Sequence, residues 1–398
     1  MKPQHIKQIL YPALLLFLIT GFFPACKKQD IIHHHVISPQ DSSHLDSIAK
    51  IDSLPSFNSP TGVAVDAAGN IFVADYGNNL IREITPGGIV STFAGSGFAG
   101  RNDATGLLAS FAQPTGIAID KLGNLFVADA GNGRIREITS AGVVTTVAGT
   151  DSTGAINGAD TSATFFDPLG VAVSGSGNVY VADAGNNLIR LISGGSVSTF
   201  AGILNTGTST TLSPFNNPTG VALDALGNVF VANYLDNNIM KVTPAGLVSI
   251  YAGSPTGDSG ANNGPAANAT FFYPNNVAVD KDNNVYVSDG VNNMIRKITP
   301  DGTVSTLAGS GATGAIDSTG VNASFNGPSG LAVDAAGNVY VADSNNNLIR
   351  KITPAGVVTT VAGSGIQGAK NGTAIARRNR KPLKLVAKGR LNIIYRKK

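Results

Sequence analysis

Short apolar stretches that alternate with turn residues run through most of this chain. The first four are rich in Val and Ile and read as β-strands: Gly62–Asp66, Asn70–Asp75, Leu80–Thr85 and Ile89–Ala94. Gly, Pro and Asn stand between them, and these residues supply the backbone conformations that tight turns need. The first stretch, Gly-Val-Ala-Val, is apolar on both faces. The pattern predicts a four-stranded antiparallel unit with that strand innermost.

The same pattern returns six times. Each copy starts at a proline, and the prolines are spaced by 54, 54, 50, 56 and 54 residues: Pro60, Pro114, Pro168, Pro218, Pro274 and Pro328. A repeat of this length with four strands is typical of a propeller blade. We therefore predict an all-β fold, a six-bladed β-propeller of four-stranded antiparallel blades, over residues 58–363.

Each copy carries the motif Pro-x-Gly-Val-Ala-Val-Asp, then Gly-Asn-hydrophobic-aromatic-Val-Ala-Asp, then Asn-Asn-x-Ile-Arg-x-Ile-Thr, with small variations. The motif closely resembles the NHL repeat, from Asn58 to about Gly363. That resemblance implies a propeller, but it does not specify an activity, because the family includes binding scaffolds, sensors and some enzymes.

The N-terminal segment has the pattern of an export signal. Lys2 and Lys7 precede an apolar run from Ile9 to Phe23, and Ala25 comes just before Cys26, the single cysteine. We expect a signal peptide over residues 1–25. The segment resembles a bacterial lipoprotein signal, which implies lipidation of Cys26, although Phe23 stands where Leu is usual. An ordinary signal peptide and an uncleaved anchor are the alternatives. Residues 26–57 are predicted to be a flexible linker.

Charge is divided unevenly along the chain. Residues 58–363 hold 12 Lys/Arg and 21 Asp/Glu, a net charge of −9, whereas residues 377–398 hold 10 Lys/Arg and no acid. Three interpretations of residues 364–398 stay open: a degenerate half-repeat, a frame-disrupted end, or a basic tail that contacts anionic lipid. The acidic repeat body argues against nucleic acid as a partner.

Histidine and cysteine are missing from the repeats, since all five His residues and Cys26 precede residue 58. A zinc site of His and Cys, or a Ser–His or Cys–His pair, therefore cannot form among the blades. Some propellers that resemble NHL proteins are lyases with metal-bound His, and this chain lacks those ligands. Recurring Asp residues end the first and second strands, and we expect turn hydrogen bonds for them, with the recurring Arg residues paired to nearby carboxylates. Asp-bound Ca²⁺ is the alternative.

Departures from the repeat are the better site candidates. The fourth copy has Asn233, Tyr234, Leu235, Asp236 and Met240 where most others have Asp-x-Gly-Asn and Arg. Tyr76 and Tyr273 also fall on turns or connections, which in a propeller emerge on one face. We predict ligand contacts at Asn233, Tyr234, Asp236, Tyr76 and Tyr273.

Two functions fit these patterns. The first is an exported, lipid-anchored, non-catalytic scaffold in the outer membrane, in the periplasm or at the cell surface, which binds a protein, peptide or glycan of the cell envelope. The alternative is a lactonase- or lyase-like enzyme on the same propeller, with Asp-bound Ca²⁺ in the central channel. Three or more carboxylates that converge there would favour the enzyme.

Overall fold

The computed structural model describes residues 54–204 and 213–374. The predicted signal peptide, Cys26, nearly all of the linker and the segment 375–398 lie outside the described residues. No helix of the described part is long and apolar enough to cross a lipid bilayer.

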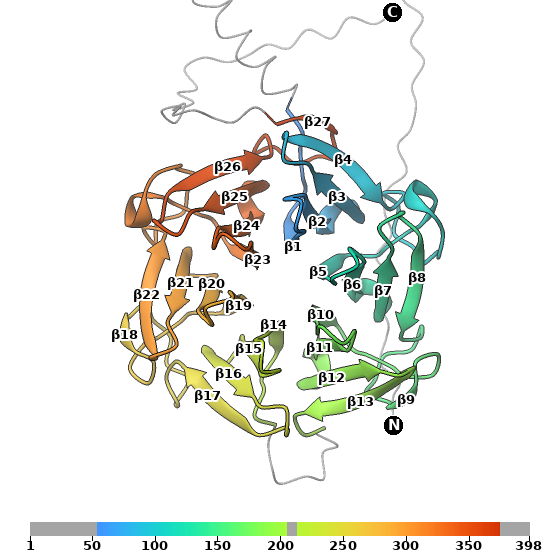
Figure 1. The fold of residues 1–398 in the computed structure, drawn as a ribbon, viewed down its shortest axis with the longest axis horizontal. Coiled ribbons are helices and arrows are strands. Elements are labelled where there is room, and N and C mark those ends of the chain that lie inside the picture. Colours follow the sequence, from blue (N-terminus) through green and yellow to red (C-terminus); the bar gives the residue numbers. More distant parts are fainter. Residues whose placement is uncertain (1–53, 205–212, 375–398) are drawn as a thin grey trace, which may run out of the picture. The chain divides into compact units, whose positions relative to one another are not determined.

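Six antiparallel sheets stand around a common axis, and each has four consecutive strands running outward from that axis (Figure 1). The predicted all-β fold and the six four-stranded blades are confirmed.

The strands of blades 1 to 3 are as follows. Blade 1 contains β1 (Pro60–Val65), β2 (Ile71–Asp75), β3 (Leu80–Ile84) and β4 (Ile89–Ala94). Blade 2 contains β5 (Pro114–Ile119), β6 (Leu125–Asp129), β7 (Arg134–Ile138) and β8 (Val144–Ala148). Blade 3 contains β10 (Pro168–Val173), β11 (Val179–Asp183), β12 (Leu188–Ser193) and β13 (Ser196–Ala201).

Blades 4 to 6 repeat the arrangement. Blade 4 contains β14 (Pro218–Leu223), β15 (Val229–Asn233), β16 (Asn238–Val242) and β17 (Val248–Ala252). Blade 5 contains β19 (Pro274–Val279), β20 (Val285–Asp289), β21 (Met294–Ile298) and β22 (Thr303–Ala308). Blade 6 contains β23 (Pro328–Val333), β24 (Val339–Asp343), β25 (Leu348–Ile352) and β26 (Val358–Ala362).

Shorter elements complete the blades. Two-residue strands lie against three outermost strands: β9 (Gly158–Ala159), β18 (Gly264–Pro265) and β27 (Gly372–Thr373). Single-turn 3-10 helices occur between second and third strands or in the long connections: η1 (Tyr76–Asn78), η2 (Gly106–Leu108), η3 (Ala130–Asn132), η4 (Ala184–Asn186), η5 (Gly320–Asn322) and η6 (Ser344–Asn346).

The apolar core is divided among the gaps between neighbouring blades. One cluster joins Ala74 and Ile81 of blade 1 to Leu125 and Val127 of blade 2. An equivalent cluster joins Tyr340 of blade 6 to blade 1, so the ring is closed. Each long connection is held in its gap by a phenylalanine three residues before the anchor proline, and this side chain is at most 2% exposed: Phe57, Phe111, Phe165, Phe215, Phe271 and Phe325.

The first blade receives chain from both ends of the propeller. Strand β27 pairs with β4, and Phe57 forms a parallel bridge with Gln367. Figure 1 shows β27 lying along the outside of blade 1. Residues after Gly363 therefore complete the first blade.

Candidate functional site

One face of the propeller, here called the loop face, gathers the turns between second and third strands and the residues just before the anchor prolines. These two sets touch in each blade: Gly77 donates its N–H to the carbonyl of Asn58 (2.9 Å), and Gly131 does the same to Ala112 (2.9 Å). Most of the predicted ligand-contacting residues lie on this face.

The Asp residues that end the first strands close their own turns. Asp66 accepts the backbone N–H of Asn70 at 2.7 Å through one oxygen and the Asn70 amide at 2.7 Å through the other. The same pair of bonds occurs at Asp120, Asp224, Asp280 and Asp334. In blade 3 the Ser174 hydroxyl accepts the N–H of Asn178 instead (3.0 Å). The predicted turn role of this set is confirmed.

The Asp residues that end the second strands are buried against arginine. Asp75 lies 2.9 Å from Arg82, and both side chains are fully buried. Four other blades repeat the pair at 2.7 Å: Asp129–Arg136, Asp183–Arg190, Asp289–Arg296 and Asp343–Arg350. Burial raises the pKa of these carboxyls, while hydrogen bonds and the arginine charge act in the opposite direction.

Each arginine also holds the long connection in place. Arg136 donates to the carbonyls of Ser110 (3.1 Å) and Asn102 (3.0 Å) and lies over the ring of Phe111, 5.2 Å from its centroid. The predicted Arg–carboxylate pairing is confirmed, and the pairs anchor loops to blades.

The described residues offer the Ca²⁺ alternative no obvious site. The central channel, about 230 Å³, is lined by apolar and glycine residues of the inner strands together with Asn276, and by no carboxylate. No group of three or more His, Cys, Asp or Glu side chains in residues 54–204 and 213–374 is placed to hold a metal ion.

The fourth blade replaces both charges of the buried pair. Asn233 takes the place of the aspartate and Met240 that of the arginine. Asn233 is fully buried, accepts the N–H of Asn216 (2.7 Å) and donates to Asp236 (3.1 Å). Asn233 therefore stabilises the turn between β15 and β16 from a buried position.

Two other predicted residues meet on the surface. The rings of Tyr234 and Tyr273 are stacked, with centroids 4.6 Å apart and planes 15° apart, and Phe272 lies 4.8 Å from Tyr273. We call Tyr234, Phe272 and Tyr273 the aromatic cluster. Burial, and then the neighbouring Tyr273, raise the pKa of Tyr234. Asp236 accepts the Asn216 amide beside the cluster (2.8 Å).

Tyr76 is far from this cluster. It lies in η1 of blade 1, and blades 1 and 4 are on opposite sides of the ring (Figure 1). The structure thus brings Tyr234, Tyr273 and Asp236 together and leaves Tyr76 apart.

The NHL repeat family matches this chain at residues 57–84, 111–138, 165–190 and 325–352. Each match begins at a buried phenylalanine and runs through the first two strands into the third strand of blades 1, 2, 3 and 6. The chain is an NHL-repeat β-propeller. The four matched repeats leave out blades 4 and 5, where Asn233, Met240 and Asn276 depart from the motif.

Curated relatives are similar to the propeller over part of their own length. Protein SUPPRESSOR OF QUENCHING 1, chloroplastic, of Arabidopsis thaliana is 28% identical over 307 residues, which cover 75% of this chain and 25% of that protein. NHL repeat-containing protein 2 of Gallus gallus is 29% identical over 346 residues, which cover 75% of this chain and 47% of that protein. The chain thus spans half or less of these relatives.

Solved structures share the fold of this NHL propeller. A structural genomics protein of unknown function from Bacteroides thetaiotaomicron matches with a TM-score of 0.58 and 20% identity, over 74% of this chain and 69% of that one. An auxiliary nutrient binding protein from the same organism matches with a TM-score of 0.55 and 16% identity, over the same shares of the two chains.

The structure adds two features that sequence analysis did not name. The first is Phe272, which belongs to the aromatic cluster. The sequence feature that could have identified it is an aromatic residue at a position where blades 1, 2, 4 and 6 have Asn58, Ala112, Asn216 and Asn326. The second feature is a cavity of about 1010 Å³ between the outer parts of blades 6 and 1 of the NHL propeller.

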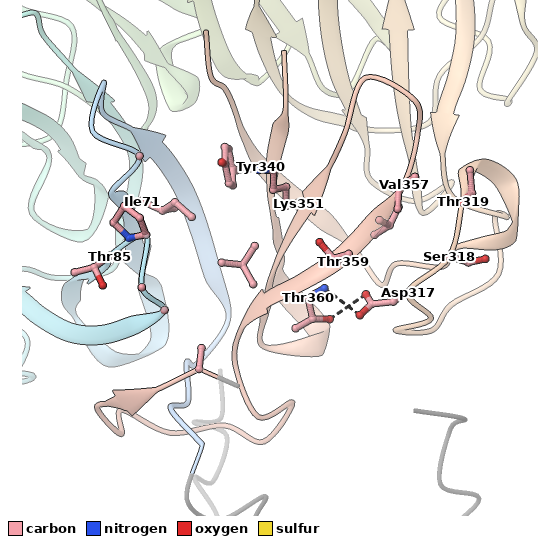
Figure 2. Close-up of a pocket in the computed structure, with 17 residues that line it drawn as sticks. Ile71, Thr85, Asp317, Ser318, Thr319, Tyr340, Lys351, Val357, Thr359 and Thr360 are labelled. Carbon is pink, nitrogen blue, oxygen red and sulfur yellow. Dashed lines mark hydrogen bonds between the residues drawn. The ribbon is translucent and has the colours of Figure 1, made fainter. Parts of the chain in front are cut away.

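We call this space between blades 6 and 1 the seam cavity, and Figure 2 shows the side chains that line it. Asp317 accepts both the backbone N–H (3.0 Å) and the hydroxyl (3.1 Å) of Thr360, and Lys351 lies over the ring of Tyr340. Ala374, the last described residue, lines the same cavity. We assign no ligand to it.

Proposed function

We propose that this NHL propeller is an exported, lipid-anchored binding scaffold whose loop face recognises a protein, peptide or glycan of the cell envelope. The aromatic cluster of blades 4 and 5 is the contact surface in this proposal. Asp236 and the exposed Leu235 and Val291 on adjacent turns extend it.

The backbone of Tyr273 is the observation that carries the proposal. Tyr273 has a φ of 52°, in the left-handed region that is costly for a bulky residue. The equivalent residues in the other blades are small or polar: Ser59, Gln113, Asp167, Asn217 and Gly327. A strained aromatic residue that stacks on a second ring at the surface points to a recognition role, since Asn in the same place would fold without strain.

Composition of the cluster supports the same role. Tyrosine combines a large apolar face with a hydroxyl, and aromatic residues are enriched at binding hot spots. The solved structures with the same fold include auxiliary nutrient binding proteins, which supports a scaffold use of the fold without naming a ligand for this chain.

Affinity capture with the mature propeller on envelope extracts tests the contact surface. We expect the double variant Tyr234→Ser/Tyr273→Asn to fold and to lose at least tenfold in affinity for the captured partner. Gln113→Asn changes the equivalent position of blade 2 and serves as the matched control. An unchanged set of captured partners with the double variant would rule out the aromatic cluster.

Cell fractionation tests the anchor separately. We expect Cys26→Ser to move the exported protein from the membrane fraction to the soluble fraction, because the acyl chains attach through the cysteine sulfur. Membrane association that survives this change, together with no fatty acid incorporated into the wild-type protein, would contradict lipidation at Cys26.

A further inference from the structure

Five of the six joints between neighbouring blades share one hydrogen bond. An asparagine that ends the turn between the second and third strands of one blade accepts the N–H of the residue before the next anchor proline, at 2.7–2.9 Å. Both residues of each pair have a left-handed backbone: Asn79–Gln113, Asn187–Asn217, Asn237–Tyr273, Asn293–Gly327 and Asn347–Ser59.

We call this hydrogen bond the joint cap. The joint between blades 2 and 3 lacks it. Gly133, with a φ of 60°, stands in the asparagine position, opposite Asp167. The N–H of Asp167 has no hydrogen-bond acceptor among the described residues. A Cβ on Gly133 would meet nothing closer than the Phe165 carbonyl at 3.5 Å, so space for a side chain exists and is unfilled.

A cavity of about 330 Å³ opens at this joint, which we call the joint pocket. Gly133, Asp167, Phe166, Arg101 and Asp151 line it. Its size is in the range of small-molecule sites.

The charged residues around the joint pocket also depart from the repeat. Asp151 accepts from Arg134 at 2.6 Å and pairs with Arg101 at 3.1 Å. Arg134 stands where the other blades have Leu80, Leu188, Asn238, Met294 and Leu348. Arg101 and Asp151 come from the connections that follow β4 and β8, where the connections after β22 and β26 have Ala or Gly. Departures from separate segments thus converge at one joint.

The chemistry of the joint pocket favours a neutral ligand with many hydroxyl groups. Arg101, Asp151 and Asp167 line the pocket, and Arg134 pairs with Asp151 from outside the lining. At the joint as a whole, two guanidinium groups and two carboxylates balance in charge, so an ion of either sign would meet its own charge as well as the opposite one. The guanidinium N–H groups of Arg101 and the backbone N–H of Asp167 can donate to a ligand, while the carboxylates of Asp151 and Asp167 can accept. Phe166 covers Gly185 and is 48% exposed, which offers an apolar surface for C–H groups.

We propose that the joint pocket binds a neutral saccharide of one or two rings. The joint pocket lies on the loop face but shares no residue with the aromatic cluster, so saccharide binding there is tested independently of the contact surface in the proposed function.

An array of neutral and acidic oligosaccharides, followed by calorimetric titration of each hit as a free di- or trisaccharide, tests the proposal. We expect the wild-type propeller to bind at least one neutral saccharide. Gly133→Asn installs the cap of the other joints, so it should fold with an equal or higher melting temperature and bind at least tenfold more weakly. Phe166→Ala should weaken binding as well.

Two controls separate this site from the proposed function. Asn187→Gly removes the cap at the joint between blades 3 and 4, which has no counterpart of Arg101 and Arg134, so this variant should gain no additional saccharide binding. The variant Tyr234→Ser/Tyr273→Asn should keep saccharide binding. The proposal is overturned if the wild type binds no neutral saccharide, if only acidic saccharides bind, or if Gly133→Asn binds as the wild type does.

Discussion

Ser56 and Lys370, which lie at opposite ends of the propeller sequence, are joined by two hydrogen bonds. The N–H of Ser56 donates to the carbonyl of Lys370 (3.1 Å), and the N–H of Lys370 donates to the hydroxyl of Ser56 (3.0 Å). Arg82 secures the joint by donating to the Ser56 carbonyl (3.1 Å) and to Asn371 (2.7 Å).

The covalent connections of the propeller contain the same bonds. Between blades 1 and 2, the N–H of Ser110 donates to the carbonyl of Asn102 (3.2 Å), and the N–H of Asn102 donates to the Ser110 hydroxyl (2.9 Å). The ring therefore closes through one ordinary connection that is divided between the two ends of the chain.

The divided connection predicts a difference between two equivalent serine substitutions. We expect Ser56→Ala and Ser110→Ala each to cost about 1 kcal/mol for the lost hydrogen bond. Ser56→Ala should in addition speed amide exchange in residues 366–374, because these residues continue from blade 6 and are held to blade 1 only by non-covalent contacts. Hydrogen exchange by mass spectrometry measures these rates. If Ser56→Ala does not exchange faster in residues 366–374 than Ser110→Ala does, the ring is not closed at this point.

Much of the fold could be predicted because short stretches of the sequence specify the strands and the turns between them. The spacing of prolines and the strand–turn pattern gave blades whose bounds agree with the structure to within one or two residues, as in β1 to β4. Residues 371–374 were not recognised as part of a blade, although Asn371-Gly372 matches Asn157-Gly158 and Asn263-Gly264. Their pairing with β4 joins residues from the two ends of the propeller sequence, and no local pattern shows such a contact.

The candidate site could be predicted only in part, for a similar reason. The repeat pattern identified Tyr234 and Tyr273 as departures, but their stacking depends on how adjacent blades meet. Asn233 looked like another surface departure, yet it is buried and compensates for Met240. The empty cap at Gly133 depends on Asp167, 34 residues later, so it appears only when the joints are compared in three dimensions.

The neutral pair of blade 4 predicts how the buried ion pairs respond to substitution. Asp129→Asn or Arg136→Met alone should cost about 3–5 kcal/mol, because each leaves one buried charge without its partner. The double variant reproduces the Asn233 and Met240 of blade 4 and should recover most of that loss. Denaturant unfolding measures all three variants, and a double variant as unstable as the sum of the single ones would refute the compensation.

Tyr340 predicts a dependence of stability on alkaline pH. Its hydroxyl donates to Asp334 (3.1 Å), and burial, followed by the charge of Asp334 and this bond, raises the pKa of Tyr340 to about 12. The folded pKa lies above the ordinary value of 10.0, so the contribution of the protonated phenol is complete below pH 10 and is lost as the pH rises through about 12.

Tyr340→Phe isolates this effect, since Phe occupies the equivalent position in blades 1, 2 and 4. We expect the variant to be less stable by about 0.5–1.5 kcal/mol at neutral pH, and the difference from the wild type to shrink above pH 10. Thermal unfolding as a function of pH measures the stability, and tyrosinate absorbance should show one late-titrating phenol fewer. A difference that does not change with pH would contradict the bond to Asp334.

The close approach of neighbouring inner strands identifies glycines whose replacement should destabilise the propeller. A Cβ at Gly62 would lie 2.2 Å from the carbonyl of Thr115 in the next blade, and a Cβ at Gly330 would lie 2.1 Å from that of Thr61. Gly62→Ala and Gly330→Ala should therefore each cost about 1–3 kcal/mol, because the inner strands would have to move apart around the whole ring. Blade 5 supplies the matched control: Asn276 already has a Cβ at this position, where Ser288 accepts its N–H (2.9 Å), so Asn276→Ala should change stability by less than about 0.5 kcal/mol. Chemical unfolding of the three variants compares them directly, and a Gly62→Ala variant as stable as Asn276→Ala would contradict the close approach of β1 and β5.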